Sequence, residues 1–418
     1  MTSLRSASAP RRLRALAPVL GVLVLAGCTA APATPKVSAA HTPPVSPSPT
    51  AAASCAEVVG ISAGHAATAS TGTTALPTYW HPSTAPRPTG SGLVPFERLA
   101  AHSTVGHTAN AAPAGSIVTF GPGTFTFHDF TGSSSAKNGA AIDPAIHGLQ
   151  GSGVSATTFQ MAPHSSTRAA SVPTTYPATN QLSLLKVTAA HARLSGFTLR
   201  GSDQGHLYNG LRLDRAVSPC VSDVRVQAIP GHNSRPPGET FGINDYRSTH
   251  ATYARVEVDG AGIGSVGLGA NGSSDITVED SYFHDNTGSM GASFWTVHNA
   301  TVTDVIATDN RRAGLNFERV SGTVVITRPV LLGNKEADMR IDSDQGTATY
   351  TIVDPVYSGP YFTVEYPKSY YGHANTQSKA TVHLIVHGKD RTKDLLRFTC
   401  PTGSLCEGIR TTVSGAAG

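Results

Sequence analysis

Three stretches of the chain decide the fold: residues 276–286 (ITVEDSYFHDN), 300–310 (ATVTDVIATDN) and 324–334 (VVITRPVLLGN). They start 24 residues apart, and each ends on an asparagine. The positions that agree in phase are Val278, Val302 and Ile326, then Tyr282, Ile306 and Val330, then Asn286, Asn310 and Asn334. A fixed period of this length predicts a solenoid of stacked rungs. Stacking would place the asparagines about 4.8 Å apart, close enough for a hydrogen-bonded ladder.

The rest of the sequence is consistent with an all-β chain. Short β-branched runs are bounded by Gly, Asn and Asp, and apolar residues at helical spacing are nearly absent, which is typical of many short strands. Earlier rungs keep the same phase but are longer, because residues 210–214 and 242–246 lie 32 residues apart. We expect the extra residues to form a loop at 229–240, leaving the solenoid at a turn.

The N-terminus has the features of an export signal. Four arginines precede the apolar run 15–26, which is too short to span a bilayer. The ending Leu25-Ala26-Gly27-Cys28 resembles the lipobox of bacterial lipoproteins, in which the cysteine is lipidated. This predicts a signal peptide over 1–27, lipidation of Cys28 and an extracellular protein anchored to the cell membrane by lipid alone. An ordinary secretory signal with an incidental cysteine is the alternative.

The remaining chain divides into four predicted segments. Residues 28–53 are rich in Pro and Ala and read as an extended tether. We expect an N-terminal cap region at 54–112, with 93–102 as a short amphipathic segment over the open end of the solenoid. The solenoid would occupy 113–360, and 361–418 would supply C-terminal rungs and a cap.

Cysteine usage fits an exported chain. Once Cys28 is lipidated, four cysteines remain, which favours disulfides over a metal site. Cys400 and Cys406 would close a tight loop, and Cys55 with Cys220 follows by elimination.

The balance of charge argues against nucleic acid as a partner. The 31 basic residues include four in the signal peptide, so 27 remain against 27 acidic residues. A mature chain of zero net charge has no bulk attraction for a polyanion. We expect a monomer whose partner is a polysaccharide.

Three further stretches resemble the pectate-lyase-like superfamily of right-handed parallel β-helix proteins. They are residues 115–125 (GSIVTFGPGTF), 146–153 (IHGLQGSG) and 194–199 (LSGFTL). The resemblance implies an all-β, single-stranded, right-handed parallel β-helix with short capping segments. It does not fix an activity, because that superfamily includes lyases, hydrolases, esterases, epimerases and binding proteins. The motifs of polygalacturonases and of the main pectate lyases are absent, so no catalytic residue is carried over.

Strand alternation predicts which side chains face outward. The first strands of successive rungs are anchored at Leu211, Ile243, Leu268, Ala292, Leu315 and Met339. Three residues further on lies an outer row: Asp214, Tyr246, Asn271, Trp295, Glu318 and Asp342. One residue after each anchor lies a second row: Arg212, Asn244, Gly269, Ser293, Asn316 and Arg340.

These rows carry the predicted site. Glu318 and Asp342 would lie on adjacent rungs, where two carboxylates can divide acid and base roles. We expect catalysis from these two residues with Arg340, and substrate binding by Trp295, Asn316, Tyr246, Asp214 and Arg212. An indole can stack on a sugar, and arginine grips an acidic sugar's carboxylate. The competing interpretation is a surface of solvated ion pairs with a tryptophan covered by a loop.

A second candidate lies at the turns beside the asparagines. His284 and Asp285, with Asp309, Arg311 and Arg312 one rung on, could supply the base and the cation of a lyase. The possible cofactor there is calcium held by aspartates, and Asp338–Asp344 is a weaker calcium candidate. The same aspartates can simply shape the turns.

Three functions therefore stay open. The first is a surface-anchored enzyme acting on polysaccharide as a lyase or glycoside hydrolase. The second is a module that binds glycans without turnover, and the third is a structural envelope protein that presents its loops to a partner.

Overall fold

The structure is a computed structural model in which 14 stretches of the chain are described. They are residues 93–95, 117–127, 140–142, 148–161, 183–201, 209–229, 240–260, 265–342, 348–357, 362–365, 369–370, 373–374, 381–387 and 410–416. The chain divides into two units, Met1–Ala51 and Ala52–Gly418, and every described residue belongs to the second. Within these stretches no helix is long and apolar enough to cross a membrane.

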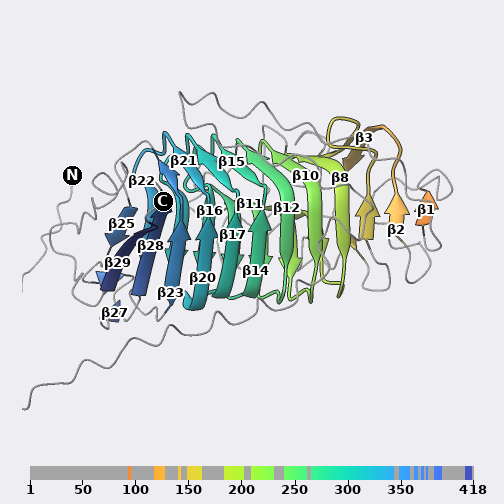
Figure 1. Cartoon of the computed structure of the whole chain (residues 1–418). Coiled ribbons are helices and arrows are strands. Elements are labelled where there is room, and N and C mark those ends of the chain that lie inside the picture. The colour runs from red at the N-terminus through yellow and green to blue at the C-terminus, as the bar shows by residue number, and fades with distance from the viewer. Residues whose placement is uncertain are drawn as a thin grey trace, which may run out of the picture. The chain divides into compact units, whose positions relative to one another are not determined.

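The described chain is a right-handed parallel β-helix, as the sequence predicts (Figure 1). Its larger sheet, sheet A, contains β1 (Leu93–Pro95), β2 (Ile117–Thr119), β3 (Gly123–Phe127), β5 (Gly148–Gln150), β6 (Thr157–Met161), β8 (Arg193–Arg200), β10 (Cys220–Gln227), β12 (Thr252–Asp259), β14 (Ser274–Glu279), β15 (Tyr282–His284), β17 (His298–Thr303), β18 (Ile306–Thr308), β20 (Ser321–Thr327), β21 (Val330–Leu332), β23 (Thr349–Val353), β24 (Val356–Tyr357), β28 (Thr381–His387) and β29 (Arg410–Ala416).

The second sheet, sheet B, supplies one strand to each rung. It contains β4 (Ala140–Ile142), β7 (Ser183–Val187), β9 (Asn209–Asp214), β11 (Thr240–Tyr246), β13 (Ser265–Asn271), β16 (Ala292–Trp295), β19 (Ala313–Glu318), β22 (Ala337–Asp342) and β25 (Phe362–Glu365). A small antiparallel pair, β26 (Ser369–Tyr370) with β27 (His373–Ala374), stands apart from both sheets.

The predicted period is confirmed residue by residue. Val278 pairs with Val302, which pairs with Ile326, and Tyr282 pairs with Ile306 in the same way. The longer early rungs also keep their predicted offset, since β10 and β12 pair with a shift of 32 residues (Val224 with Val256). Parallel pairing therefore stacks the rungs in register although their loops differ in length.

The asparagine ladder forms as expected. The Nδ2 of Asn286 donates to Oδ1 of Asn310 over 2.8 Å, and the Nδ2 of Asn310 donates to Oδ1 of Asn334 over 2.9 Å. The Nδ2 of Asn334 also donates to Oδ1 of buried Asp338, over 3.1 Å. All three asparagines are buried, and the ladder gives each Nδ2 group an acceptor that it would otherwise lose on burial.

A column of glycines runs beside the ladder and is required by it. A Cβ added at Gly291 would lie 2.8 Å from Nδ2 of Asn310 and 2.6 Å from the carbonyl oxygen of Gly314. One rung further, a Cβ at Gly314 would lie 2.7 Å from Nδ2 of Asn334. Only glycine lets the backbone approach the amides this closely, so the two columns depend on each other.

The corners of the helix are built from left-handed residues stacked in four turn columns. All 18 described non-glycine residues with positive φ fall into them. The columns are His191, Ser218, His250, Asp275 and Asn299; Asp223, Arg255, Asp280, Asp304, Arg328 and Asp354; Ala228, Asp285 and Asp309; and Arg215, Arg247, Thr296 and Arg319. Aspartate and asparagine tolerate this conformation better than arginine does. In-register stacking thus forces each corner to recur at the same place in successive rungs.

The interior is a continuous apolar core. It includes stacked phenylalanines, such as Phe294 over Phe317 with ring centroids 4.8 Å apart. Asp245 is a fully buried carboxylate that accepts hydrogen bonds from the hydroxyls of Tyr253 (2.9 Å) and Ser273 (3.0 Å). Burial raises the pKa of Asp245, although these hydrogen bonds oppose the rise.

Several predictions fall on residues outside the described stretches. These are the signal peptide, lipidation at Cys28, the tether, the Cys400–Cys406 bridge and residues 230–239 of the predicted loop. Cys220, at the start of β10, is disulfide-bonded. Its pairing with Cys55 stays a prediction because Cys55 is not described. Leu93–Pro95, expected in an amphipathic cap, forms a strand that pairs with β2.

Removing one rung of the ladder should destabilise the helix. We expect Asn310→Ala to lower the free energy of unfolding by about 2–4 kcal/mol, because it leaves the buried amides of Asn286 and Asn334 without their partner. Thr301→Ala, an exposed position in the same rung, should change it by less than about 0.5 kcal/mol. Guanidinium unfolding followed by circular dichroism measures both. Equal midpoints for the two variants would contradict a stabilising ladder.

Candidate functional site

The predicted rows on sheet B are in register. The anchors pair as expected, with Leu211 beside Ile243 and Leu315 beside Met339. In the outer row the successive partners are Asp214, Tyr246, Asn271, Trp295, Glu318 and Asp342, and Glu365 continues it. The structure therefore brings the predicted outer row together along six consecutive rungs.

The basic end of the outer row surrounds Tyr246. The guanidinium carbons of Arg212 and Arg247 each lie 5.0 Å from the centre of its ring, and that of Arg215 lies 6.0 Å away. These distances are within the range of cation–π attraction. Arg215 and Arg247 belong to a turn column, and their positive φ of 56° keeps two cations at this edge of sheet B.

Asp214 neutralises part of this positive charge. Its Oδ2 lies 3.1 Å from Nζ of Lys186 and 3.6 Å from the guanidinium of Arg212. Burial lowers the pKa of Arg212, and the charge of Asp214 opposes that effect. Among the described side chains here, one carboxylate faces four cations, and this positive balance suits an anionic ligand.

The acidic end of the row contains the two predicted carboxylates. Glu318 on β19 pairs with Asp342 on β22, so the two residues are neighbours on adjacent rungs, about 4.8 Å apart along the helix axis. Trp295 precedes Glu318 in the row, and both are half-buried. Nε1 of Trp295 is buried and has no hydrogen-bond partner among the described residues.

The second row is more enclosed than strand alternation suggests, and we name it the covered row. Asn244, Asn316 and Arg340 are 2%, 1% and 7% exposed. Part of the cover is visible: the ring of Phe241 occupies the space where a Cβ of Gly269 would lie, at 2.3 Å. Asn316 donates to Oγ of Ser293 over 2.9 Å. The side chains of the covered row are therefore buried next to the outer row, whose side chains are more exposed to solvent.

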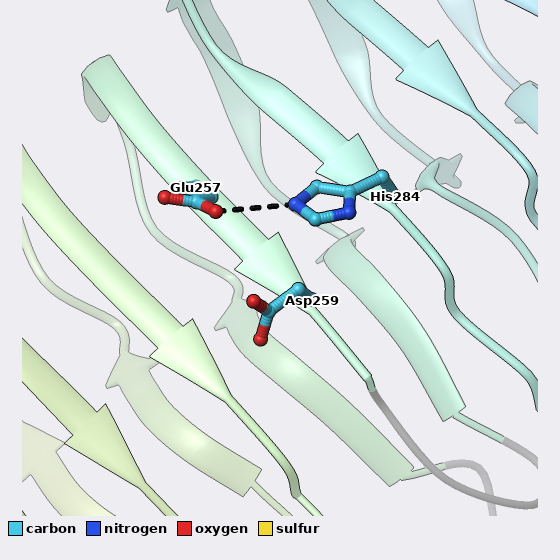
Figure 2. Close-up of side chains that lie close together, drawn as sticks. All are labelled: Glu257, Asp259 and His284. Atoms are coloured by element: carbon cyan, nitrogen blue, oxygen red, sulfur yellow. Dashed lines mark hydrogen bonds and ion pairs between the residues drawn. The ribbon is translucent and has the colours of Figure 1, made fainter. Parts of the chain in front are cut away.

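A different cluster on sheet A was not singled out from the sequence as a unit. Glu257 and Asp259 lie on β12, and His284 lies on β15 of the next rung, where it pairs with Asp259 (Figure 2). Their ligand atoms all lie within 4.8 Å of one another. The side chains are only 12–15% exposed.

Both ring nitrogens of His284 face carboxylates. Nε2 lies 3.1 Å from Oε1 of Glu257, and Nδ1 lies 2.8 Å from Oδ2 of Asp285. The ring of Tyr282 stacks on the imidazole at 3.9 Å, which fixes its plane. Arg225, one rung earlier, contacts the same carboxylates: its guanidinium binds Asp259, and its Nε lies 3.4 Å from Glu257.

The pKa of His284 is raised above its ordinary value of 6.5. Burial alone would lower it, but the hydrogen bonds to Glu257 and Asp285 and the charges of Asp259 and Glu257 outweigh burial. Burial also raises the pKa of Tyr282, and the neighbouring carboxylates add to that rise. The cluster is thus arranged to hold positive charge at His284.

The sequence grouped His284 and Asp285 with Asp309, which follows Asp285 in the same turn column, but it did not include Glu257 and Asp259. Arg312 pairs with Glu336 on the next rung, over 2.8 Å. The missed signal was available: Glu257 and Asp259 alternate outward on the strand that contains Val256 and Val258, and His284 follows Asp259 by one rung of 25 residues. Of the weaker calcium candidates, Asp338 is buried beneath the asparagine ladder.

The charge on His284 should couple to folding. Because its folded pKa is raised, the stabilisation is complete below pH 6.5 and is lost as the pH rises through the folded pKa. Histidine-selective NMR in buffer with a chelator should give His284 a pKa above the ordinary value of 6.5. Glu257→Gln should lower it. A His284 pKa below 6.5 in the unsubstituted protein would contradict this account.

Comparison with known proteins finds remote similarity to solved structures. No protein-family model and no curated protein matches the chain. Similar solved structures include the A-module of the Azotobacter vinelandii mannuronan C-5 epimerase AlgE4, at 13% identity and a TM-score of 0.48, covering 77% of this chain and 95% of that one. The Agl-KA catalytic domain is 14% identical with a TM-score of 0.44, covering 80% and 70%.

Pectate lyase Pel9A is 12% identical with a TM-score of 0.42, covering 75% of this chain and 73% of that one. Similarity at this level says nothing of activity, since this fold supports many. The strand register itself establishes that the described chain has a parallel β-helix fold.

Proposed function

We propose that the chain is a polysaccharide-active protein that binds an extended acidic glycan along the outer row of sheet B and hydrolyses it. The observation that supports this most directly is the register of the row, which places Tyr246, Trp295 and the Glu318–Asp342 pair in one line. A chain of sugars is the ligand that matches a repeating line of contacts.

The spacing of the row suits a polymer. Successive rungs lie about 4.8 Å apart, which is close to the length of one pyranose unit. A glycan lying parallel to the helix axis would therefore meet one outer-row side chain per sugar. Tyr246 and Trp295, two rungs apart, offer aromatic rings against which sugar faces pack.

The charges favour an acidic glycan over a neutral one. Arg212, Arg215 and Arg247 gather around Tyr246 with Lys186 nearby, and Asp214 is the one carboxylate among these described residues. Guanidinium groups bind carboxylates through paired hydrogen bonds, so a uronate unit over Tyr246 is the expected ligand there. Calcium is not required by this arrangement.

The chemistry is assigned to Glu318 and Asp342. Two carboxylates about 5–5.5 Å apart allow a retaining glycosidase reaction, with one group as acid and the other as nucleophile. Their neighbouring positions on adjacent rungs are compatible with that separation. Arg340, in the covered row beside Asp342, is 7% exposed, and we assign it to positioning that carboxylate. Asn316 has an equivalent supporting place beside Glu318.

The proposed location is the outer surface of a bacterial cell. Lipidation of Cys28 and the Pro-rich segment 28–53 would hold the β-helix away from the membrane, where extracellular polysaccharides are accessible. This placement rests on the sequence of the N-terminus.

The proposal is tested by incubating the protein with acidic and neutral polysaccharides. We expect new reducing ends from an acidic polymer without the absorbance of unsaturated uronates. Glu318→Gln should lower turnover by about 100-fold or more while binding persists. Arg247→Gln should weaken binding of the acidic polymer by roughly tenfold.

Matched controls lie away from the outer row. Exposed Arg200 on β8 and Glu336, which pairs with Arg312, are replaced by glutamine and should change neither quantity. Ultraviolet absorbance from unsaturated uronate products would contradict hydrolysis and indicate a lyase. Binding without turnover in the unsubstituted protein would contradict an enzyme and indicate a glycan-binding module.

A further inference from the structure

The His284 cluster lies on sheet A and has no part in the function proposed for sheet B. Glu257 and Asp259 lie on one rung and His284 on the next, and the strand register places His284 directly beside Asp259. Figure 2 shows the Glu257 carboxylate directed at the imidazole, with Asp259 at the end of the same strand. A nitrogen and two carboxylates within 4.8 Å of one another can converge on a single ion.

The imidazole is held in the orientation of a metal ligand. Its Nδ1 contacts Asp285 at 2.8 Å, and Tyr282 stacks on its face. Histidines that bind metals commonly have a carboxylate on the nitrogen away from the ion, which fixes the ring and makes the ligating nitrogen more basic. Here that arrangement leaves Nε2 to face Glu257.

The contact between Nε2 of His284 and Oε1 of Glu257 is favourable only when a proton or a metal ion lies between the two atoms. A neutral imidazole has a single N–H, yet both of its nitrogens lie within hydrogen-bond distance of carboxylate oxygens. In either tautomer one nitrogen lone pair faces a carboxylate oxygen, which is repulsive. A second proton removes the repulsion, and so does a metal ion between Nε2 and Oε1.

We propose that Glu257, Asp259 and His284 bind a divalent cation of the zinc class. Imidazole nitrogens and carboxylate oxygens are both zinc ligands, and three protein ligands leave a fourth position open to water. Calcium and magnesium take oxygen ligands almost exclusively, so the histidine disfavours them. Asp285 is the positioning residue that orients His284.

Arg225 is the internal competitor of the metal. Its guanidinium binds Asp259 and lies near Glu257, so it neutralises two of the three ligands. The side chain is 29% exposed and can turn toward solvent when an ion takes its place. This arrangement predicts that removing the arginine strengthens metal binding, whereas a purely structural ion-pair cluster predicts no binding in either form.

Isothermal titration calorimetry of the chelator-treated protein with zinc chloride tests the site. We expect a zinc-binding event that His284→Ala and Asp259→Asn abolish. Asp285→Asn should weaken it by about tenfold. Arg225→Gln should strengthen it by about fivefold, because an ion pair no longer has to be broken. Calcium chloride should give no event at this site.

The controls separate this site from other histidines. His298, an exposed histidine on β17, is replaced by alanine and should leave zinc affinity unchanged. Circular dichroism shows whether each variant folds. The tighter zinc binding expected for Arg225→Gln is a gain, so a folding defect cannot produce it. The proposal is overturned if zinc binding survives both His284→Ala and Asp259→Asn, or if neither the unsubstituted protein nor Arg225→Gln binds zinc.

Discussion

In-register stacking of the rungs is the constraint on which the rest of the structure depends. Parallel backbone hydrogen bonds hold each rung on the next, and the buried ladder of Asn286, Asn310 and Asn334 fixes the phase. A slip by one residue would move the apolar core outward and separate the amides. The glycine positions beside the ladder have no room for a Cβ, so no other residue can occupy them without a clash. Because phase is fixed, outward side chains also form straight rows.

The sequence predicts this fold well because a solenoid repeats its signal. The 24-residue phase and the 32-residue offset of the early rungs are local patterns, and both match the strand register. The same reasoning correctly aligned Trp295 with Glu318 and Glu318 with Asp342. Burial was harder to predict, since alternation says that Asn316 and Arg340 leave the core but not what covers them. The His284 cluster was missed because Glu257 and Asp259 lie on the rung before Ile276, where the comparison of 24-residue rungs begins.

The two faces show how one scaffold can carry separate chemistries. Sheet B presents a line of aromatic and charged groups, positive around Tyr246 and acidic at Glu318. Sheet A gathers Glu257, Asp259 and His284 at one point. The extended outer row suits a polymer, whereas the compact cluster on sheet A suits a single ion. The two proposals are independent of each other. Left-handed arginines at the corners cost conformational energy, so their places beside Tyr246 favour a role beyond turning the chain.

A crystal structure of the protein bound to an acidic oligosaccharide tests the central claim most directly. The account predicts sugar rings lying parallel to the helix axis over the outer row of sheet B, with a uronate carboxylate among the arginines around Tyr246 and a glycosidic bond between Glu318 and Asp342. An oligosaccharide bound on sheet A, across the rungs or at an end of the helix would contradict it.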